Sequence, residues 1–226
     1  MGVAQSSGVF RVSGGNPIGG RIQPAGNKNE ALPLLAAALL TEDSVTLQNV
    51  PRIEDVAIMQ EIVQSLGARI ATSADGLEIK CADVPVNQLD PRLTARIRGS
   101  VTLAGPLLAR TGRIFLPRPG GDRIGRRRMD THILGLQALG ASVEVLPHGF
   151  ELKARQLTGA DILLDEASVT ATENIVCAAT LARGTTIIRH AASEPHVQGL
   201  CHMLNAMGAR IQGIGSNTLT VEGVDR

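Results

Sequence analysis

Apolar positions recur at helical spacing along the chain, and several such stretches end in the same short phrase. In residues 56–66 the apolar side chains occupy positions 56, 58, 59, 62, 63 and 66, which fall on one face of a helix. This stretch closes on Leu-Gly-Ala-Arg-Ile at 66–70, and related phrases return at 139–143 and 207–211. A glycine just after a helix can adopt the left-handed conformation that closes the last turn. The phrases therefore predict three helix ends, each followed by a strand-like segment.

A second recurring phrase precedes each of these helices. Residues 39–47, 108–116 and 181–188 each combine a Leu- or Ala-rich end, a short polar or glycine turn, and a β-branched or apolar run. Each predicts a helix end, a tight turn and a strand. Because both phrases recur in the same order, we expect three helix–strand–helix–strand–strand repeats, at about 28–95, 96–158 and 159–224. A generic α/β domain with accidental similarity is the alternative.

The residues before the first repeat have a different character. Phe10–Val12 is strand-like, and glycines at 14, 15, 19 and 20 alternate with turn residues. Their spacing fits neither GxGxxG nor GxxxxGK[ST], so they are interpreted as turns rather than a nucleotide loop. The sequence thus predicts an N-terminal segment, 1–25, and one domain of three repeats, 26–226, without a linker between the repeats.

Composition narrows the classes of function. The 226 residues include three Phe but no Trp or Tyr, and the formal net charge is +1. The core must therefore be aliphatic, and the stacking platforms and basic field of a nucleic-acid binder are missing. The longest apolar run, 31–40, contains a proline and is too short to span a membrane. Three widely spaced cysteines without a CxxC pair suit the cytoplasm and argue against a disulfide framework or a zinc site.

One candidate site lies at the start of an Ala/Leu-rich helix. The phrase Gly-Asn-Lys-Asn-Glu-Ala-Leu-Pro at 26–33 predicts a helix with Pro33 in its first turn, where proline is tolerated. Lys28 and Asn29 would then stand at the positive end of the helix, where backbone N–H groups favour an anion. The alternative is an Asn cap beside a solvated lysine.

A second candidate is a basic loop. Five arginines fall within residues 118–132, beside two glycine turns and the acids Asp122 and Asp130. Arginine binds phosphate oxygens in bidentate fashion, so the loop could hold a phosphate group. A solvated loop or a nucleic-acid patch are the competing interpretations, and the lack of aromatics and the two acids count against nucleic acid.

A third segment, 165–174, leads into an apolar helix predicted at Ile175–Leu181. Thr170 and Glu173 fit the S/T-x-x-E capping box, and a structural role is the default interpretation. The five histidines show no metal-ligand spacing and no partner nucleophile, so we predict that they are structural and that there is no metal site.

Taken together, these phrases resemble the enolpyruvyl transferases that act on UDP-N-acetylglucosamine. The resemblance rests on 26–33, 98–107, 116–125, 168–174, Glu194-Pro195 and 221–224, in this order over nearly the whole chain. It implies an α/β (α+β) fold of the inside-out type, in which a domain of three helix-and-strand units surrounds buried helices. A sibling enzyme that acts on a shikimate shares the fold but not these phrases.

The resemblance also implies a reaction and its ligands. The 3′-hydroxyl of UDP-N-acetylglucosamine attacks phosphoenolpyruvate, a tetrahedral adduct forms, and phosphate leaves. In this family the reaction is the first committed step of peptidoglycan synthesis, it takes place in the cytoplasm, and it needs no metal or organic cofactor. Neither nucleic acid nor a membrane is an implied partner.

Site residues follow from the same resemblance. Phosphoenolpyruvate would be held by Lys28, Asn29, Arg98 and Arg127. The residues implied in catalysis are Lys28, Arg127 and Asp122, with Asp122 the general acid if its pKa is raised. The residues implied in binding the UDP-sugar are Arg98, Arg127, Arg128, Met129, Asp130, Thr131, Ser168, Val169 and Thr170.

Three departures from the family pattern matter. Arg128 stands where Pro is usual and Glu166 where Lys is common, and both fall in the expected nucleotide site. The chain is also about half the family's length. We therefore expect a truncated or split half, inactive without a complementary second-half chain, whose sheet would take up the 1–25 segment. The alternative is a non-catalytic UDP-sugar or anion-binding module.

Overall fold

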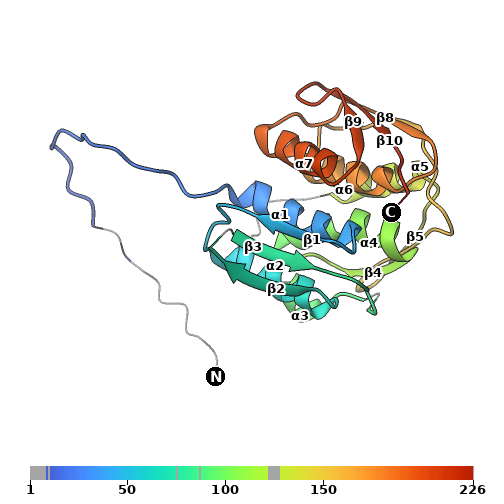
Figure 1. The fold of residues 1–226 in the computed structure, drawn as a ribbon, viewed down its shortest axis with the longest axis horizontal. Helices are drawn as coiled ribbons and strands as arrows, with labels where there is room; N and C mark the ends of the chain where they lie inside the picture. Colours follow the sequence, from blue (N-terminus) through green and yellow to red (C-terminus); the bar gives the residue numbers. More distant parts are fainter. Residues whose placement is uncertain (1–8, 10, 75, 87, 122–127, 226) are drawn as a thin grey trace.

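The three sequence repeats fold into three units with the same order of elements (Figure 1). The computed structural model describes residues 9, 11–74, 76–86, 88–121 and 128–225. In the first unit a helix with a 3-10 extension leads through a strand to a second helix and a hairpin. Its elements are α1 (Lys28–Ala37), η1 (Ala38–Leu40), β1 (Ser44–Leu47), α2 (Glu54–Ser65), β2 (Arg69–Ser73) and β3 (Gly76–Lys80).

The second unit repeats this order after a short helical entry. Its elements are α3 (Pro91–Thr94), η2 (Arg98–Leu103), α4 (Ala104–Thr111), β4 (Arg113–Pro117), α5 (Asp130–Ala138), β5 (Ser142–Leu146) and β6 (Gly149–Lys153). The third unit begins with a strand that the sequence pattern did not predict. Its elements are β7 (Asp161–Leu163), α6 (Val169–Thr180), β8 (Thr185–Arg189), α7 (Pro195–Ala206), β9 (Arg210–Gln212) and β10 (Thr218–Glu222).

Each unit forms its own small antiparallel sheet with one topology. The strand orders are β1-β3-β2, β4-β6-β5 and β7-β8-β10-β9, so the last strand always lies between the other two. In the third sheet β7 is added at the edge and pairs in parallel with β8. The common topology confirms the repeat prediction at the level of strand pairing.

The predicted turns have the expected backbone. Gly67, Gly140 and Gly208, which follow the second helix of each unit, have φ values of 107°, 95° and 108°. These positive values lie in the region that glycine adopts without steric cost, which explains why the phrase carries glycine each time. Each helix therefore ends where the sequence predicts.

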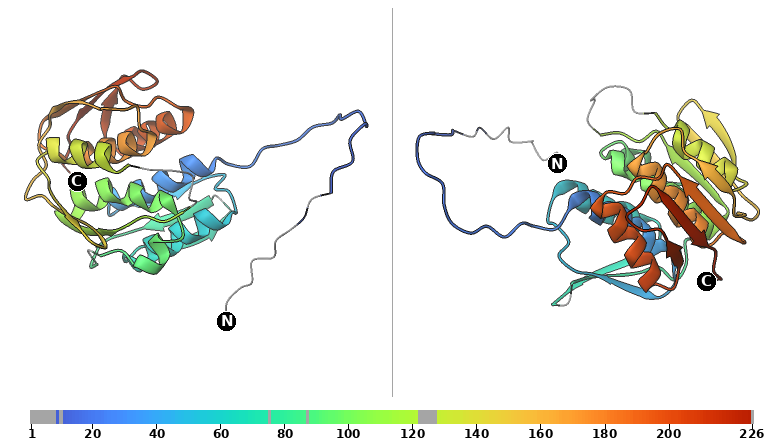
Figure 2. Two further views of the ribbon diagram at one scale, coloured as in Figure 1. Left: turned by 180° about the vertical axis from the view of Figure 1, so that it is seen from behind. Right: turned by 90° about the horizontal axis from the view of Figure 1, so that it is seen from above.

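Helices fill the interior and the sheets lie around them (Figures 1 and 2). The helices that correspond to α1 in the second and third units, α4 and α6, pack against each other, and both contact η2, which also contacts α1. Every residue of α6 from Ala171 to Thr180 is buried. The core is aliphatic as predicted, and its large fully buried side chains include Leu35, Met59, Ile62, Leu103 and Ile114.

Arg110 is a buried charge that joins the first two units. Its guanidinium donates to the carbonyl oxygens of Leu39 and Thr41 at 2.8 and 2.7 Å and to those of Cys81 and Ala82 at 3.0 Å. These carbonyls include the end of η1, where backbone acceptors have no helical partner. Arg110 thus holds the end of η1 and the segment after β3 against α4.

The N-terminal segment extends away from the body of the molecule (Figure 1). Residues 11–25 contain no helix or strand, so the strand predicted at Phe10–Val12 is not present at Val12, and Phe10 lies outside the described residues. The apolar side chains of Val9, Val12, Ile18 and Ile22 are 88–101% exposed. No helix in the described part of the chain is both long and apolar enough to cross a membrane.

Candidate functional site

A cavity of about 350 Å³ lies where the three units meet. Its walls come from the start of α1, from η2 and from the start of α6. It brings together five of the residues predicted from the sequence: Lys28, Asn29, Arg98, Val169 and Thr170. A larger hollow of about 740 Å³ lies beside the β1–α2 loop, but it contains none of the predicted residues, so we assign the site by its chemistry.

The α1 wall provides an exposed cation and a helix end. α1 begins at Lys28, and the side chain of Asn27 caps it by accepting a hydrogen bond from Asn29 N at 2.8 Å. Lys28 Nζ lies 2.9 Å from Asp55 Oδ2, and both side chains are about half exposed. The expectation that Lys28 and Asn29 stand at the positive end of this helix is confirmed.

The position predicted for Pro33 is wrong. Pro33 lies inside α1, at its sixth residue, rather than in the first turn. Its ring nitrogen carries no hydrogen, so the carbonyl of Asn29 loses its usual acceptor role within the helix. Pro33 itself lines the cavity. The helix begins earlier than expected because Asn27, and not a residue nearer the proline, supplies the cap.

Arg98 links the cavity to the segment after the basic loop. Its guanidinium Nη2 donates to the carbonyl oxygen of Arg128 and contacts Met129 Sδ, each at 3.4 Å. The loop starts close to the same region, because Gly120 N donates to Thr94 O at 3.0 Å. A Cβ at Gly120 would lie 1.7 Å from Ala95 O, so only glycine allows this approach.

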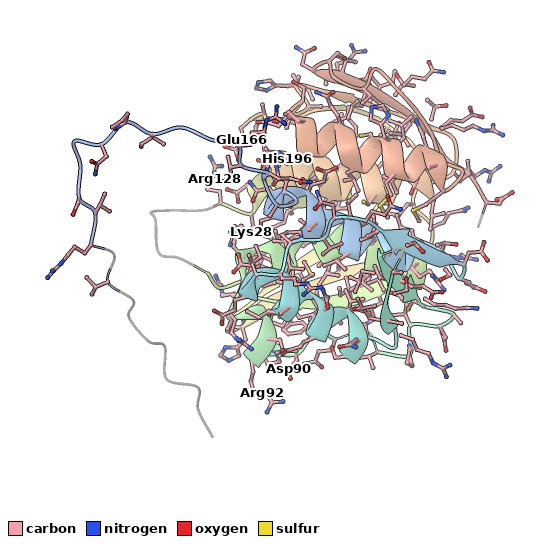
Figure 3. All side chains as sticks on the ribbon, turned by 60° about the vertical axis from the view of Figure 1, so that its left-hand side comes forward. Lys28, Asp90, Arg92, Arg128, Glu166 and His196 are labelled. Carbon is pink, nitrogen blue, oxygen red and sulfur yellow. The ribbon has the colours of Figure 1, made fainter. Side chains whose placement is uncertain are left out.

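The segment expected to bind nucleotide is rich in acids. Arg128 forms an ion pair with Asp130, and the buried Thr131 hydroxyl donates to Asp165 Oδ1 at 2.7 Å and to Glu166 Oε1 at 3.3 Å. The Thr131 hydrogen bond is the main cause of a lowered pKa at Asp165. Arg128, Met129, Asp130, Thr131 and Ser168 lie beside the cavity rather than in its wall. Figure 3 shows Arg128 and Glu166 on the same side of the molecule as Lys28 and His196.

The capping box predicted at the start of α6 is wrong. The helix begins at Val169 with Ser168 as N-cap, and no side chain caps it. Thr170 is therefore already the second helical residue, and its Oγ1 lies 3.2 Å from His132 Nε2. Glu173 is the fifth helical residue, too far along to reach the N-cap. Both side chains line the cavity instead.

Glu173 is a functional candidate that the sequence reasoning missed. It is 2% exposed, and its Oε1 has no hydrogen-bond partner among the described residues. Burial, and after it the charge of Glu194, raise the pKa of Glu173 to about 8. The carboxyl group is thus mostly protonated at neutral pH and can donate a hydrogen bond into the cavity. The only sequence signal was its place in the phrase 168–174.

Two predicted residues cannot be placed. Asp122, expected to act as general acid, and Arg127, expected to bind phosphoenolpyruvate, lie outside the described residues. No group of three or more His, Cys, Asp or Glu side chains in the described part of the chain is arranged to hold a metal ion.

A domain with three such units around central helices, and with a cationic cavity between them, is of the enolpyruvyl transferase type. Residues 12–226 match the sequence model of the EPSP synthase (3-phosphoshikimate 1-carboxyvinyltransferase) family, and the chain belongs to this family. The predicted fold class and family resemblance are thereby confirmed.

Individual relatives refine the comparison. The chain is 54% identical over 215 residues to a UDP-N-acetylglucosamine 1-carboxyvinyltransferase of Bradyrhizobium diazoefficiens, covering 95% of this chain and 50% of that protein. It is 54% identical over 220 residues to the protein of the same name from Treponema denticola, covering 96% and 51%. The chain thus spans about half the length of these relatives.

A solved structure shows the same fold. The enolpyruvyl transferase NikO from Streptomyces tendae superposes with a TM-score of 0.79 at 24% identity, over 93% of this chain and 50% of that one. An EPSP synthase from Acinetobacter baumannii superposes with a TM-score of 0.71 at 18% identity. At these identities the likeness concerns the fold alone.

Proposed function

We propose that this chain forms one lobe of an enolpyruvyl transferase that moves the enolpyruvyl group of phosphoenolpyruvate to the 3′-hydroxyl of UDP-N-acetylglucosamine. The observation that carries the proposal is the cavity in which Lys28, Asn29, Arg98 and Thr170 come together. The names of the relatives supply UDP-N-acetylglucosamine and the transfer of a carboxyvinyl group. Phosphoenolpyruvate as the donor, and a role in peptidoglycan synthesis in the cytoplasm, are what the family resemblance implies.

The cavity has the chemistry that an anionic substrate needs. Lys28 provides a point charge, Asn29 lies in the first turn of α1, and Arg98 adds a guanidinium from the η2 wall. Phosphate and carboxylate groups bind well where a helix N-terminus and cationic side chains converge. A protonated Glu173 adds a neutral donor, whereas an ionised one would repel the same anion.

Catalysis by this lobe would require a second one. The cavity is not enclosed, and the reacting groups of a transfer must be held in attack geometry, which is worth ~7–11 kcal/mol of the barrier. The exposed apolar side chains of Val9, Val12, Ile18 and Ile22 also need a cover that the described body does not provide. A complementary second-half polypeptide would supply both, with the 1–25 segment packed against it.

The test measures phosphate release from phosphoenolpyruvate and UDP-N-acetylglucosamine. We expect no turnover from the 226-residue chain alone and turnover once a polypeptide that matches the second half of the relatives is added. In that mixture Lys28→Ala should abolish turnover by removing a phosphate contact. Lys80→Ala, at an exposed lysine of β3, is the matched control and should leave the rate unchanged.

Two results would count against the proposal. If the mixture binds UDP-N-acetylglucosamine but releases no phosphate, the chain belongs to a binding module and not to a transferase. If Lys28→Ala and Lys80→Ala behave alike, the α1 wall is not the site of the anion.

A further inference from the structure

A series of buried hydrogen bonds connects Thr170 through His132 to Asn174, and neither His132 nor Asn174 has a role in the proposed reaction. Asn174 Oδ1 accepts from Gly105 N at 2.6 Å, and Asn174 Nδ2 donates to Val101 O at 2.8 Å. The same Nδ2 lies 2.9 Å from His132 Nδ1, and His132 Nε2 lies 3.2 Å from Thr170 Oγ1. Asn174 is fully buried and His132 is 4% exposed.

The partners of Asn174 determine its orientation. A backbone N–H can only donate and a backbone carbonyl can only accept, so the amide oxygen must face Gly105 and the amide nitrogen must face Val101. The nitrogen carries two hydrogens. One goes to Val101 O, and the other points to His132 Nδ1.

This orientation determines the tautomer of His132. Nδ1 accepts a hydrogen bond and therefore carries no proton, so the proton of the neutral ring sits on Nε2. Burial, and to a lesser extent the charge of Arg98, lower the pKa of His132 to about 4, which keeps the ring neutral at physiological pH. Nε2–H then donates to Thr170 Oγ1.

The donor-to-acceptor direction of these hydrogen bonds determines what the Thr170 hydroxyl can do at the cavity. Because Thr170 Oγ1 accepts the hydrogen bond from His132 Nε2–H, its own hydroxyl hydrogen must point elsewhere. No acceptor for that hydrogen is found among the described residues, and Thr170 lines the cavity that also contains Lys28 and Arg98. The hydroxyl is thus available as a donor to whatever occupies the cavity.

We propose that His132 and Asn174 are positioning residues that present the Thr170 hydroxyl as a hydrogen-bond donor to a phosphate or carboxylate oxygen of the substrate. The inference rests on the proposed function, since it assumes an anion in the cavity. It adds a specificity rule, because the cavity would favour an acceptor at this point and disfavour a group that can only donate.

The first test reads the tautomer without any ligand. In the ¹⁵N-labelled 226-residue chain at pH 7, two-bond ¹⁵N–¹H correlation should show a protonated Nε2 and a bare Nδ1 at His132, assigned by the loss of these signals in His132→Phe. A protonated Nδ1, or a doubly protonated ring, would overturn the inference even if anions bind.

The second test measures binding of inorganic phosphate, phosphoenolpyruvate and UDP-N-acetylglucosamine separately. The comparison shows which of these ligands carries the oxygen that accepts from the Thr170 hydroxyl. Since a hydrogen bond to a charged group is at stake, Thr170→Val should weaken at least one of the three roughly tenfold or more. Thr170→Ser, which keeps the hydroxyl, should bind like the unchanged chain. Thr220→Val, at a half-buried threonine of β10, is the control.

A double-mutant cycle separates positioning from mere folding. His132→Phe should weaken binding of the same ligand by a factor of about three or more, and adding Thr170→Val should then cost less than it does alone. Independent effects of the two changes would reject the positioning role. If the unchanged chain binds none of the three anions, the proposed function fails together with the inference. If the unchanged chain binds the anions and the Thr170→Val variant binds them equally tightly, only the inference fails.

Discussion

Two of the walls of the cavity, those from α1 and α6, are built in opposite ways. The α1 wall presents Lys28 on the surface, paired with Asp55 across 2.9 Å, with both side chains about half exposed. The α6 wall presents Thr170 and Glu173 from a helix that is buried from Ala171 to Thr180, and His132 of α5 is hydrogen-bonded to this helix. One wall carries charge in water, and the other carries neutral polar groups in the interior.

This difference assigns different tasks to the two walls. An exposed ion pair contributes at most about 1 kcal/mol to stability, so the α1 wall can give up its partner to a ligand at little cost. Buried polar groups cost free energy when they lose their partners, so the α6 wall must keep its arrangement whether or not a ligand is present. We therefore expect changes on the α6 wall to alter folding as well as binding, and changes on the α1 wall to alter binding with little effect on stability.

The largest expected effect is the pH dependence that Glu173 imposes on stability. Its pKa rises from 4.5 when exposed to about 8 in the folded protein. The folded state therefore binds more protons than the unfolded state between these values, and stability present below pH 4.5 is lost as the pH rises through 8. At ~1.36 kcal/mol per pH unit, the difference approaches about 5 kcal/mol.

Chemical unfolding between pH 4.5 and 9 checks this for Glu173→Gln. The glutamine variant should lack this loss, so its unfolding free energy relative to the unchanged chain should rise with pH. Glu144→Gln, at an exposed glutamate of β5, should follow the unchanged chain at every pH. Parallel curves for all three proteins would show that Glu173 is ionised in the folded state.

The next largest effect on stability is expected at Asn174, at the centre of the buried hydrogen bonds. Asn174→Ala leaves Gly105 N–H and His132 Nδ1 without a partner and removes one of the two hydrogen bonds of Val101 C=O, which keeps the bond from Ala104 N–H. We expect a loss of roughly 3–5 kcal/mol in unfolding free energy. Asn205 makes a similar pair of bonds to the backbone of Ile211 but is half buried. Asn205→Ala should therefore cost clearly less in the same denaturant titration, and equal losses would contradict the premise that burial makes the polar groups behind the α6 wall costly to disrupt.

The fold could be predicted well because its signals are local and repeated. Glycine at 67, 140 and 208 marks a helix end through its own backbone preference, and the β-branched runs that follow form strands in every unit. The extra strand β7 could not be predicted in this way. It has three residues and pairs in parallel with β8, so it depends on a tertiary contact rather than on a local pattern.

The α1 wall could be predicted because its phrase combines a cap, a cation and a helix start in consecutive residues. The α6 wall could not, since the role of Glu173 depends on which residue becomes the N-cap. With Ser168 in that position, the box formed by Thr170 and Glu173 shifts by two residues into the helix, and both side chains turn toward the cavity. Likewise, His132 and Asn174 are 42 residues apart, and no spacing rule joins them.

The smallest expected effect on stability, and the sharpest test of the α1 wall, comes from Asp55→Asn. Asp55 lines the cavity and pairs with Lys28, so a bound anion must compete with it for the lysine. Removing one exposed charge should change the unfolding free energy by less than about 1 kcal/mol. Because a unit charge at ~4 Å in water is worth about 1 kcal/mol, inorganic phosphate should bind roughly fivefold more tightly. Calorimetric titration at low salt checks this, and the gain in phosphate affinity should shrink as salt rises.

Asp43→Asn, at an exposed aspartate away from the cavity, is the control. In the Lys28→Ala background the gain should fall to whatever Asp55 contributes by repelling the anion directly. An Asp55→Asn chain that binds phosphate no better than the Asp43→Asn chain would mean that Lys28 does not contact the anion, and the charge contrast between the two walls would then have no role in binding.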